Sequence, residues 1–140
     1  MTGEGAAPPV TIRLEGSSMQ PLIRRNVDTV TIIPLSRDLK TGDVILFTTG
    51  PGHYVVHRVW KIEKDRFRTL GDNCFNPDPW LPRGNALGQA IAFCRNGRKY
   101  RLDTRGARLW GRFWMLLYPA RKCFKRFRSF AGRCYRKVFK

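Results

Sequence analysis

The sequence predicts a mainly β domain of antiparallel strands, followed by one or two amphipathic α-helices at the C-terminal end. Short segments rich in Val, Ile and Thr recur through the first hundred residues, separated by Gly, Pro, Asn and Asp turns. After Asp103 the apolar residues recur at intervals of three and four positions, which is the spacing typical of one face of an α-helix. A length of 140 residues suits a single domain with one modest core.

Each expected strand lies between turn residues. The expected strands are 10–14, 27–33, 44–48, 54–62, 67–70, 86–94 and 99–102. Asn96-Gly97 predicts a tight hairpin, because both residues tolerate the positive φ that strand twist requires there. Residues 73–83 hold three prolines without periodicity, which predicts a structured loop. Residues 1–9, rich in Gly, Ala and Pro, are expected to be a disordered N-terminus, and 10–103 the β domain.

The segment 104–140 is predicted to be a basic, amphipathic helical tail. The first helix has its apolar residues at Ala107, Trp110, Phe113, Trp114 and Leu117. Asp103 or Thr104 can cap its start, and Pro119 interrupts its end. The stripe of the second helix is Cys123, Phe124, Phe127, Ala131, Cys134, Tyr135 and Val138. Its basic residues are expected to face away from that stripe: Lys122, Lys125, Arg126, Arg133, Arg136 and Lys137.

Charge is unevenly distributed. The chain has 27 Lys and Arg against 10 Asp and Glu, and twelve of the basic residues lie in 105–140, which has no acidic residue. Affinity for a polyanion is therefore a property of the tail. Three roles stay open: the tail covers the β core, it binds an anionic membrane surface, or it binds nucleic acid. Nucleic acid is the least favoured, because the sequence shows no recognised nucleic-acid motif.

Neither a secretory signal nor a membrane-spanning run is visible. Met1–Val10 contains Glu4, no Lys or Arg, and no apolar stretch. We therefore expect a cytoplasmic location, with peripheral binding at the inner face of the membrane as an open alternative. The four cysteines do not follow a zinc spacing and are expected to be free thiols, with Cys123 and Cys134 packing on one side of a helix. We expect no metal and no cofactor.

Residues suited to nucleophilic catalysis occur in three short segments. Ser18 lies in Gly16–Pro21, His57 follows Val55-Val56, and Asp78 comes shortly after Gly71-Asp72-Asn73. A serine hydroxyl needs a base to take its proton, and the base needs an anion to orient it. An imidazole has an ordinary pKa of about 6.5, so it can act as that base near neutrality.

Two choices remain open in this set. Either Asp78 or Asp72 could accept a hydrogen bond from the second ring nitrogen of His57, and Asp78 is preferred. His53, beside Gly52 in a turn, is a rival base. It is less favoured than His57, which is followed by Arg-Val.

These segments resemble the conserved boxes of the signal peptidase I family. The matching segments are Gly16–Pro21 (GSSMQP), Gly42–Phe47 (GDVILF), Val56–Val59 (VHRV), Gly71–Asn73 (GDN) with Asp78, and Leu87–Ala90 (LGQA). Bacterial members carry lysine where His57 stands, whereas the archaeal, endoplasmic-reticulum and SipW-like members carry histidine. The chain is therefore similar to the Ser–His branch, over roughly residues 10–94.

The resemblance implies a signal peptidase/LexA-like peptidase fold and a serine endopeptidase that cleaves a peptide or protein precursor. Ser18 would be the nucleophile, His57 the general base and Asp78 the supporting carboxylate, while Asp72 builds its loop. The backbone N–H of Ser18 and the hydroxyl of Ser17 would stabilise the oxyanion.

The chain departs from the family in two ways. We expect no transmembrane anchor before Ser18, and the box that links the base strand to Gly-Asp in bacterial enzymes is absent. These departures favour a compact processing peptidase over a housekeeping signal peptidase. The alternative is a catalytically inactive binding module that its tail attaches to membrane or nucleic acid. A LexA-like self-cleaving regulator is least favoured, because such proteins use a lysine base and need a longer linker before the nucleophile.

Overall fold

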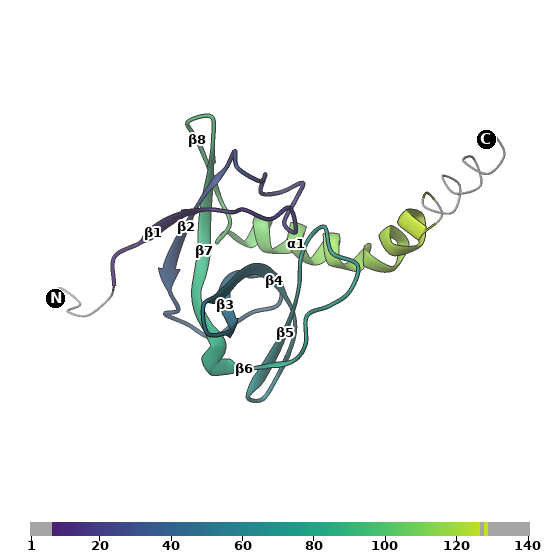
Figure 1. The fold of residues 1–140 in the computed structure, drawn as a ribbon, viewed down its shortest axis with the longest axis horizontal. Helices are drawn as coiled ribbons and strands as arrows, with labels where there is room; N and C mark the ends of the chain where they lie inside the picture. Colours follow the sequence, from purple (N-terminus) through teal and green to yellow (C-terminus); the bar gives the residue numbers. More distant parts are fainter. Residues whose placement is uncertain (1–6, 127, 129–140) are drawn as a thin grey trace.

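The computed structural model describes residues 7–126 and 128, in which one antiparallel sheet precedes two helical segments (Figure 1). The neighbours in the sheet run β1-β2-β7-β3-β4-β5-β6, and β8 pairs with β7. The strands are β1 (Val10–Arg13), β2 (Thr29–Pro34), β3 (Val44–Gly50), β4 (His53–Glu63), β5 (Arg66–Leu70), β6 (Leu81–Pro82), β7 (Ala86–Arg95) and β8 (Arg98–Arg101). The predicted fold class, mainly antiparallel β with C-terminal helices, is confirmed.

Tight turns join the strands that follow one another in the sequence. The β7–β8 hairpin turns at Asn96 and Gly97, whose φ angles of 51° and 78° are the positive values predicted from that pair. Gly42, with φ of 97°, forms the turn before β3 and brings its backbone against the C-terminal helix. β4 is long enough to pair with β3 through its first half and with β5 through its second.

The core consists of two clusters of buried apolar side chains. One surrounds the segment that follows β1 and contains Met19, Ile23, Val30, Ile32, Val44, Val56, Ala90 and Phe93. The other lies under β3, β4 and β5 and contains Leu39, Ile45, Phe47, Val59 and Phe67. Because Met19 and Ile23 are completely buried, the first cluster anchors the backbone beside Ser18.

The observed strands differ from the predicted ones by one or two residues at most ends, and the start of β2 has a clear physical reason. β2 begins at Thr29 rather than at 27, because the Asp28 carboxylate accepts from the backbone N–H of Arg24 at 2.8 Å and closes a turn there. Arg95 holds the same carboxylate from β7 at 2.6 Å. The predicted loop 73–83 contains the short strand β6 and leads into a 3-10 turn, η1 (Arg83–Asn85).

Helix α1 (Arg105–Leu116) begins at Thr104, whose side-chain oxygen accepts from the backbone N–H of Ala107 at 3.1 Å. A second helical segment covers residues 118–126, with Pro119 in its first turn. Phe127, Ala131, Cys134, Tyr135, Val138, Arg133, Arg136 and Lys137 of the predicted second helix lie outside the described residues. Within the part of the chain that is described, no helix is both long and apolar enough to cross a membrane.

The C-terminal helices direct several residues of their apolar stripes away from the β domain. Gly111 and Met115 are the buried residues of α1, whereas Trp110 and Phe113 are exposed. In the second segment Lys125, expected to face away from the apolar stripe, is directed at the β domain, where its Nζ atom donates to Asn73 Oδ1. Its stripe residues Phe124 and Cys123 are exposed, so the predicted packing of Cys123 is wrong.

Candidate active site

The structure brings Ser18, His57 and Asp78 together. His57 Nδ1 lies 2.5 Å from Asp78 Oδ2, and His57 Nε2 lies 3.0 Å from Ser18 Oγ. The three side chains come from the segment after β1, the middle of β4 and the loop between β5 and β6. One imidazole therefore contacts a hydroxyl through one nitrogen and a carboxylate through the other.

Ser18 is held by its neighbours on both sides. The next residue, Met19, is fully buried in the core and fixes the local backbone. The carbonyl oxygen of Ser18 accepts a hydrogen bond from the backbone N–H of Asn73 at 2.8 Å. The side-chain amide of Asn73 also donates to the carbonyl of Ser17 at 3.2 Å. These contacts join the serine segment to the loop that carries Asp78.

His57 is almost fully buried on β4, where it pairs with Ile45 and meets the edge of the Phe47 ring at a centroid distance of 6.1 Å. Burial lowers the pKa of the imidazole, but hydrogen bonds with Asp78 and Cys74, together with their charges, outweigh it and raise the pKa to about 9. The imidazolium form is therefore well stabilised at this position.

Asp78 accepts a second hydrogen bond, from the Thr69 hydroxyl at 2.6 Å. Burial raises the pKa of this carboxyl, but the hydrogen bonds from His57 and Thr69 outweigh it, so the pKa lies below its ordinary value. The backbone of Asp78 is fixed as well: its N–H donates to the Thr69 carbonyl at 2.8 Å, and Arg68 Nε donates to its carbonyl at 2.7 Å. The carboxylate is thus anionic and firmly placed.

Asp72, the other carboxylate considered for His57, lies elsewhere. It accepts two hydrogen bonds from Arg58, each 2.9 Å long, and both side chains are buried. Arg58 also donates to the carbonyl of Gly42 at 2.9 Å. This pair fastens the loop after β5 to β4, which is the structural role that the sequence favoured for Asp72.

The two remaining predicted residues, Ser17 and His53, are both exposed at the edge of the site. Ser17 is exposed next to Ser18, and its carbonyl accepts from the backbone N–H of Gln20 at 3.1 Å. His53, the rival base, is exposed at the first residue of β4, four residues before His57. A strand rises about 3.3 Å per residue, so His53 lies about 13 Å along the strand from His57.

Four residues at the site were not singled out from the sequence: Thr69, Cys74, Arg68 and Gly71. A Cβ on Gly71 would lie 2.5 Å from Cys74 Sγ, 2.8 Å from the Ser18 carbonyl oxygen and 3.1 Å from His57 Nε2. The glycine of the Gly-Asp-Asn segment was the one available signal, since a residue without a Cβ is favoured where the backbone approaches another group closely.

The C-terminal helices contact the same loop. Trp114 Nε1 and Arg121 Nη1 donate to the carbonyl of Asp72, at 3.0 and 2.5 Å. Lys125 Nζ donates to Asn73 Oδ1 at 2.9 Å, and the Tyr118 hydroxyl donates to the carbonyl of Phe75. The described part of the tail thus supports the loop that touches Ser18.

A groove of about 310 Å³ opens beside Ser18. Its lining residues are Ile12, Arg13, Leu14, Glu15, Gly16, Ser18, Leu46, Tyr54, Val55 and Val56. A wider hollow of about 810 Å³ lies at the β4–β5 turn and Trp80, and none of the three clustered residues lines it. No family model matches this chain, and no curated protein matches it.

Proposed function

We propose that this protein is a serine endopeptidase of the signal peptidase-like type, with Ser18 as nucleophile and His57 as general base. One observation carries the proposal: the His57 imidazole lies within hydrogen-bonding distance of both other residues. Its Nδ1 atom is 2.5 Å from Asp78 Oδ2, and its Nε2 atom is 3.0 Å from Ser18 Oγ. Nucleophilic acyl transfer needs this arrangement, in which a base lies between the nucleophile and the carboxylate that orients the base.

In the proposed reaction His57 Nε2 takes the proton of Ser18 as Oγ attacks the scissile carbonyl carbon. The backbone N–H of Ser18 and the Ser17 hydroxyl would bind the oxyanion of the tetrahedral intermediate. The imidazolium then gives its proton to the departing amine, which leaves an ester on Ser18. Water hydrolyses this ester with His57 again acting as base, and Asp78 stabilises the imidazolium in both halves.

The groove beside Ser18 supports a peptide substrate in an extended conformation. It combines apolar side chains such as Ile12, Leu46 and Val56 with the exposed residues Glu15 and Gly16 just before the nucleophile. Among the described strands, β1 pairs with β2 on one side and forms an edge of the sheet. A substrate strand can add to such an edge through main-chain hydrogen bonds.

A serine-reactive acylating probe tests the proposal. We expect the wild-type protein to gain one adduct, which tandem mass spectrometry locates at Ser18. Ser18→Ala and His57→Ala should not be labelled, whereas the matched controls Ser17→Ala and His53→Ala should react. The Ser17 control should react more slowly, because an oxyanion donor typically contributes on the order of a hundredfold or more. Equal labelling of all five proteins would reject the enzymatic function and leave a non-catalytic binding module.

A further inference from the structure

Helix α1 has apolar residues on both of its faces. The face that contacts the β domain carries Gly111 and Met115. The opposite face, here called the apolar face, consists of Leu109, Trp110, Phe113, Leu116 and Leu117, all exposed. Leu116 is 79% exposed and Leu109 63%, although a surface helix normally turns such residues toward the core.

Specific contacts fix this orientation of the helix. Gly111 lies so close to Arg58 that a Cβ would be 2.1 Å from its Nη1 atom, so no larger residue fits on the inner face there. Trp114 Nε1 donates to the Asp72 carbonyl at 3.0 Å, and Arg112 Nε donates to the Thr41 carbonyl at 3.1 Å. A rotation that buried the apolar face would break all of these contacts.

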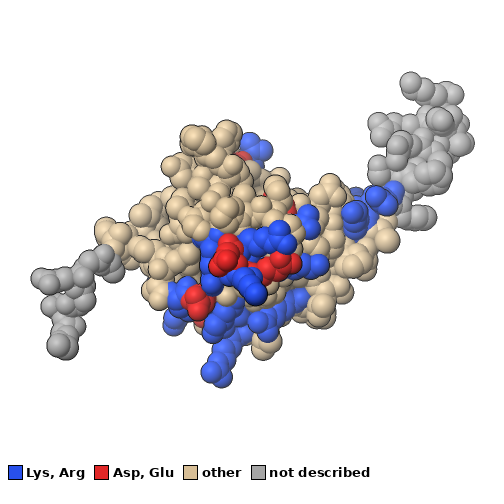
Figure 2. Space-filling model, turned by 90° about the horizontal axis from the view of Figure 1, so that it is seen from below, with Lys and Arg blue, Asp and Glu red and all other residues tan. Residues whose placement is uncertain are grey.

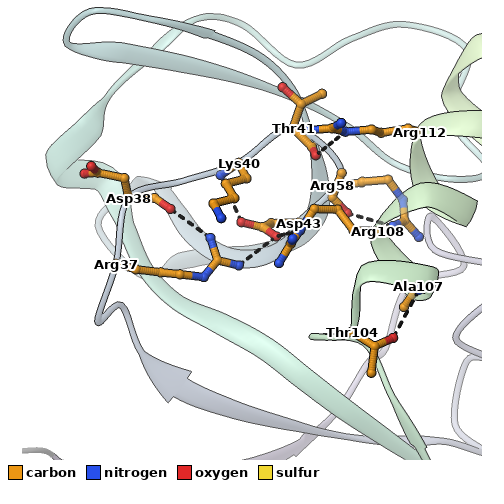
Figure 3. Close-up of polar contacts among 11 residues, drawn as sticks. Arg37, Asp38, Lys40, Thr41, Asp43, Arg58, Thr104, Ala107, Arg108 and Arg112 are labelled. Carbon is orange, nitrogen blue, oxygen red and sulfur yellow. Dashed lines mark hydrogen bonds and ion pairs between the residues drawn. The ribbon is translucent and has the colours of Figure 1, made fainter.

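A basic pocket lies directly beside the apolar face. It has a volume of about 270 Å³ and is lined by Lys40, Arg105, Arg108, Leu109 and Arg112. One lining residue, Arg108, binds the Asp43 carboxylate at 3.2 Å, and Arg37 binds the same carboxylate at 3.0 Å (Figure 3). The positive charge of the pocket therefore exceeds what Asp43 neutralises.

The same charge imbalance extends along the helix. The segment 105–128 contains no acidic residue. Figure 2 shows one face of the molecule on which Lys and Arg side chains gather around a few acidic ones. Leu109 belongs both to the apolar face and to the lining of the basic pocket, so apolar and cationic groups are adjacent on one helix. This combination is typical of helices that lie in a membrane interface.

We propose that α1 docks on an anionic phospholipid surface, with the apolar face at the acyl boundary and the basic pocket holding headgroup phosphates. Trp110 would lie at headgroup depth, where indole rings are favoured. The phosphates would bind Lys40 and Arg105, two basic residues that line the pocket and that are not among the contacts named above as fixing the helix. This inference goes beyond the proposed peptidase and does not depend on it.

Co-sedimentation of the full chain with vesicles tests the proposal. We expect binding to vesicles that contain phosphatidylglycerol, with a blue shift of tryptophan emission, and much weaker binding to phosphatidylcholine alone. Lys40→Gln/Arg105→Gln should weaken the partition coefficient by about 25-fold, since each basic residue near the surface contributes about fivefold. Leu109→Ser/Leu116→Ser should weaken it about tenfold or more, because both leucines would lose their burial.

Matched variants control for charge and hydrophobicity. Lys64→Gln/Arg98→Gln removes the same charge from exposed positions on the β4–β5 turn and β8, and Val27→Ser/Leu87→Ser removes exposed apolar groups outside α1. Both controls, and Ser18→Ala, should bind vesicles as the wild type does. The proposal is overturned if the wild type does not bind anionic vesicles. It is also overturned if Leu109→Ser/Leu116→Ser binds as strongly as wild type. That result would indicate a purely electrostatic attraction, which nucleic acid or free phosphate could satisfy equally well.

Discussion

His57 and Arg58, consecutive residues of β4, each bind a different carboxylate of the segment that follows β5. Successive residues of a strand point to opposite sides of the sheet. His57 therefore meets Asp78 and Ser18 on one side, while Arg58 meets Asp72 on the other, under α1. The Arg58–Asp72 ion pair fixes the segment after β5 on one side of the sheet, and His57 contacts Asp78 of the same segment on the other side. The contacts of Arg58 should thus affect the stability of the whole region.

We expect Arg58→Met to destabilise the fold by about 3–5 kcal/mol, because it leaves the Asp72 carboxylate buried without its cation. Urea unfolding measures this loss. The matched control is Arg66→Met, which breaks an exposed pair with Glu63 and should cost less than about 1 kcal/mol. Arg58→Met/Asp72→Leu should recover part of the stability, since no charge then remains buried. Equal stability of Arg58→Met and wild type would contradict the prediction.

The raised pKa of His57 predicts an alkaline pH profile. Acylation by a serine-reactive probe needs the neutral imidazole, so its rate should rise with pH to a midpoint near 9. Asp78→Asn removes the anion that stabilises the imidazolium. The midpoint should then fall toward the ordinary value of 6.5, and the plateau rate should fall by about two to four orders of magnitude.

The same shift links pH to stability. Because the folded pKa is higher than the unfolded one, His57 stabilises the fold fully below pH 6.5 and loses this contribution as the pH rises through about 9. Wild type should therefore lose more unfolding free energy than Asp78→Asn between those values. Asp65→Asn, an exposed carboxylate in the β4–β5 turn, is the control and should behave as wild type. If Asp78→Asn kept the acylation midpoint of wild type, Asp78 would not be the group that raises the pKa of His57.

Local patterns were sufficient to predict most of the sheet, whereas the three clustered site residues needed the order of several segments taken together. Period-two segments of β-branched residues between turn residues lie close to the observed strands, and Asn96-Gly97 adopts the positive φ values that its chemistry favours. The expectation that Ser18, His57 and Asp78 act together came from the resemblance of several ordered segments to one family, and not from any one segment. Which carboxylate His57 contacts depends on tertiary structure.

The orientation of the C-terminal helices could not be read from hydrophobic periodicity. The inner face of α1 is decided by Gly111, which carries no hydrophobic signal, against Arg58, 53 positions earlier in the chain. Arg121 and Lys125 turn inward because carbonyl and amide oxygens of residues 72 and 73 accept their hydrogen bonds. Such long-range polar contacts decide which side of each helix meets the sheet, since a buried carbonyl without a donor is costly.

Gly71 should be intolerant of even one methyl group. In Gly71→Ala the Cβ would meet the Ser18 carbonyl oxygen at 2.8 Å and His57 Nε2 at 3.1 Å, so the hydroxyl and the imidazole must move apart. We expect the acylation rate to fall by a hundredfold or so, as for other displacements of about 1 Å at a reacting centre. Gly84→Ala is the matched control, since a Cβ there meets nothing within 4 Å. Full activity of Gly71→Ala would show that the close approach is unimportant.

Cys74 lies beside His57, so changing or modifying it should alter the rate of acylation at Ser18. Its sulfur contributes to the raised pKa of the imidazole, so Cys74→Ala should move the pH midpoint of acylation below that of wild type. A bulky maleimide on Cys74 would fill the space next to Gly71 and His57 and should abolish probe labelling.

Cys94, half-buried as Cys74 is but located on β7, provides the matched comparison. Maleimide should inactivate Cys94→Ala as it does wild type, whereas Cys74→Ala should keep its labelling after the same treatment. Intact-mass analysis gives the number of modified thiols in each sample. If maleimide inactivates Cys74→Ala as fully as wild type, another thiol controls access to Ser18, and the contact between Cys74 and His57 has no functional consequence.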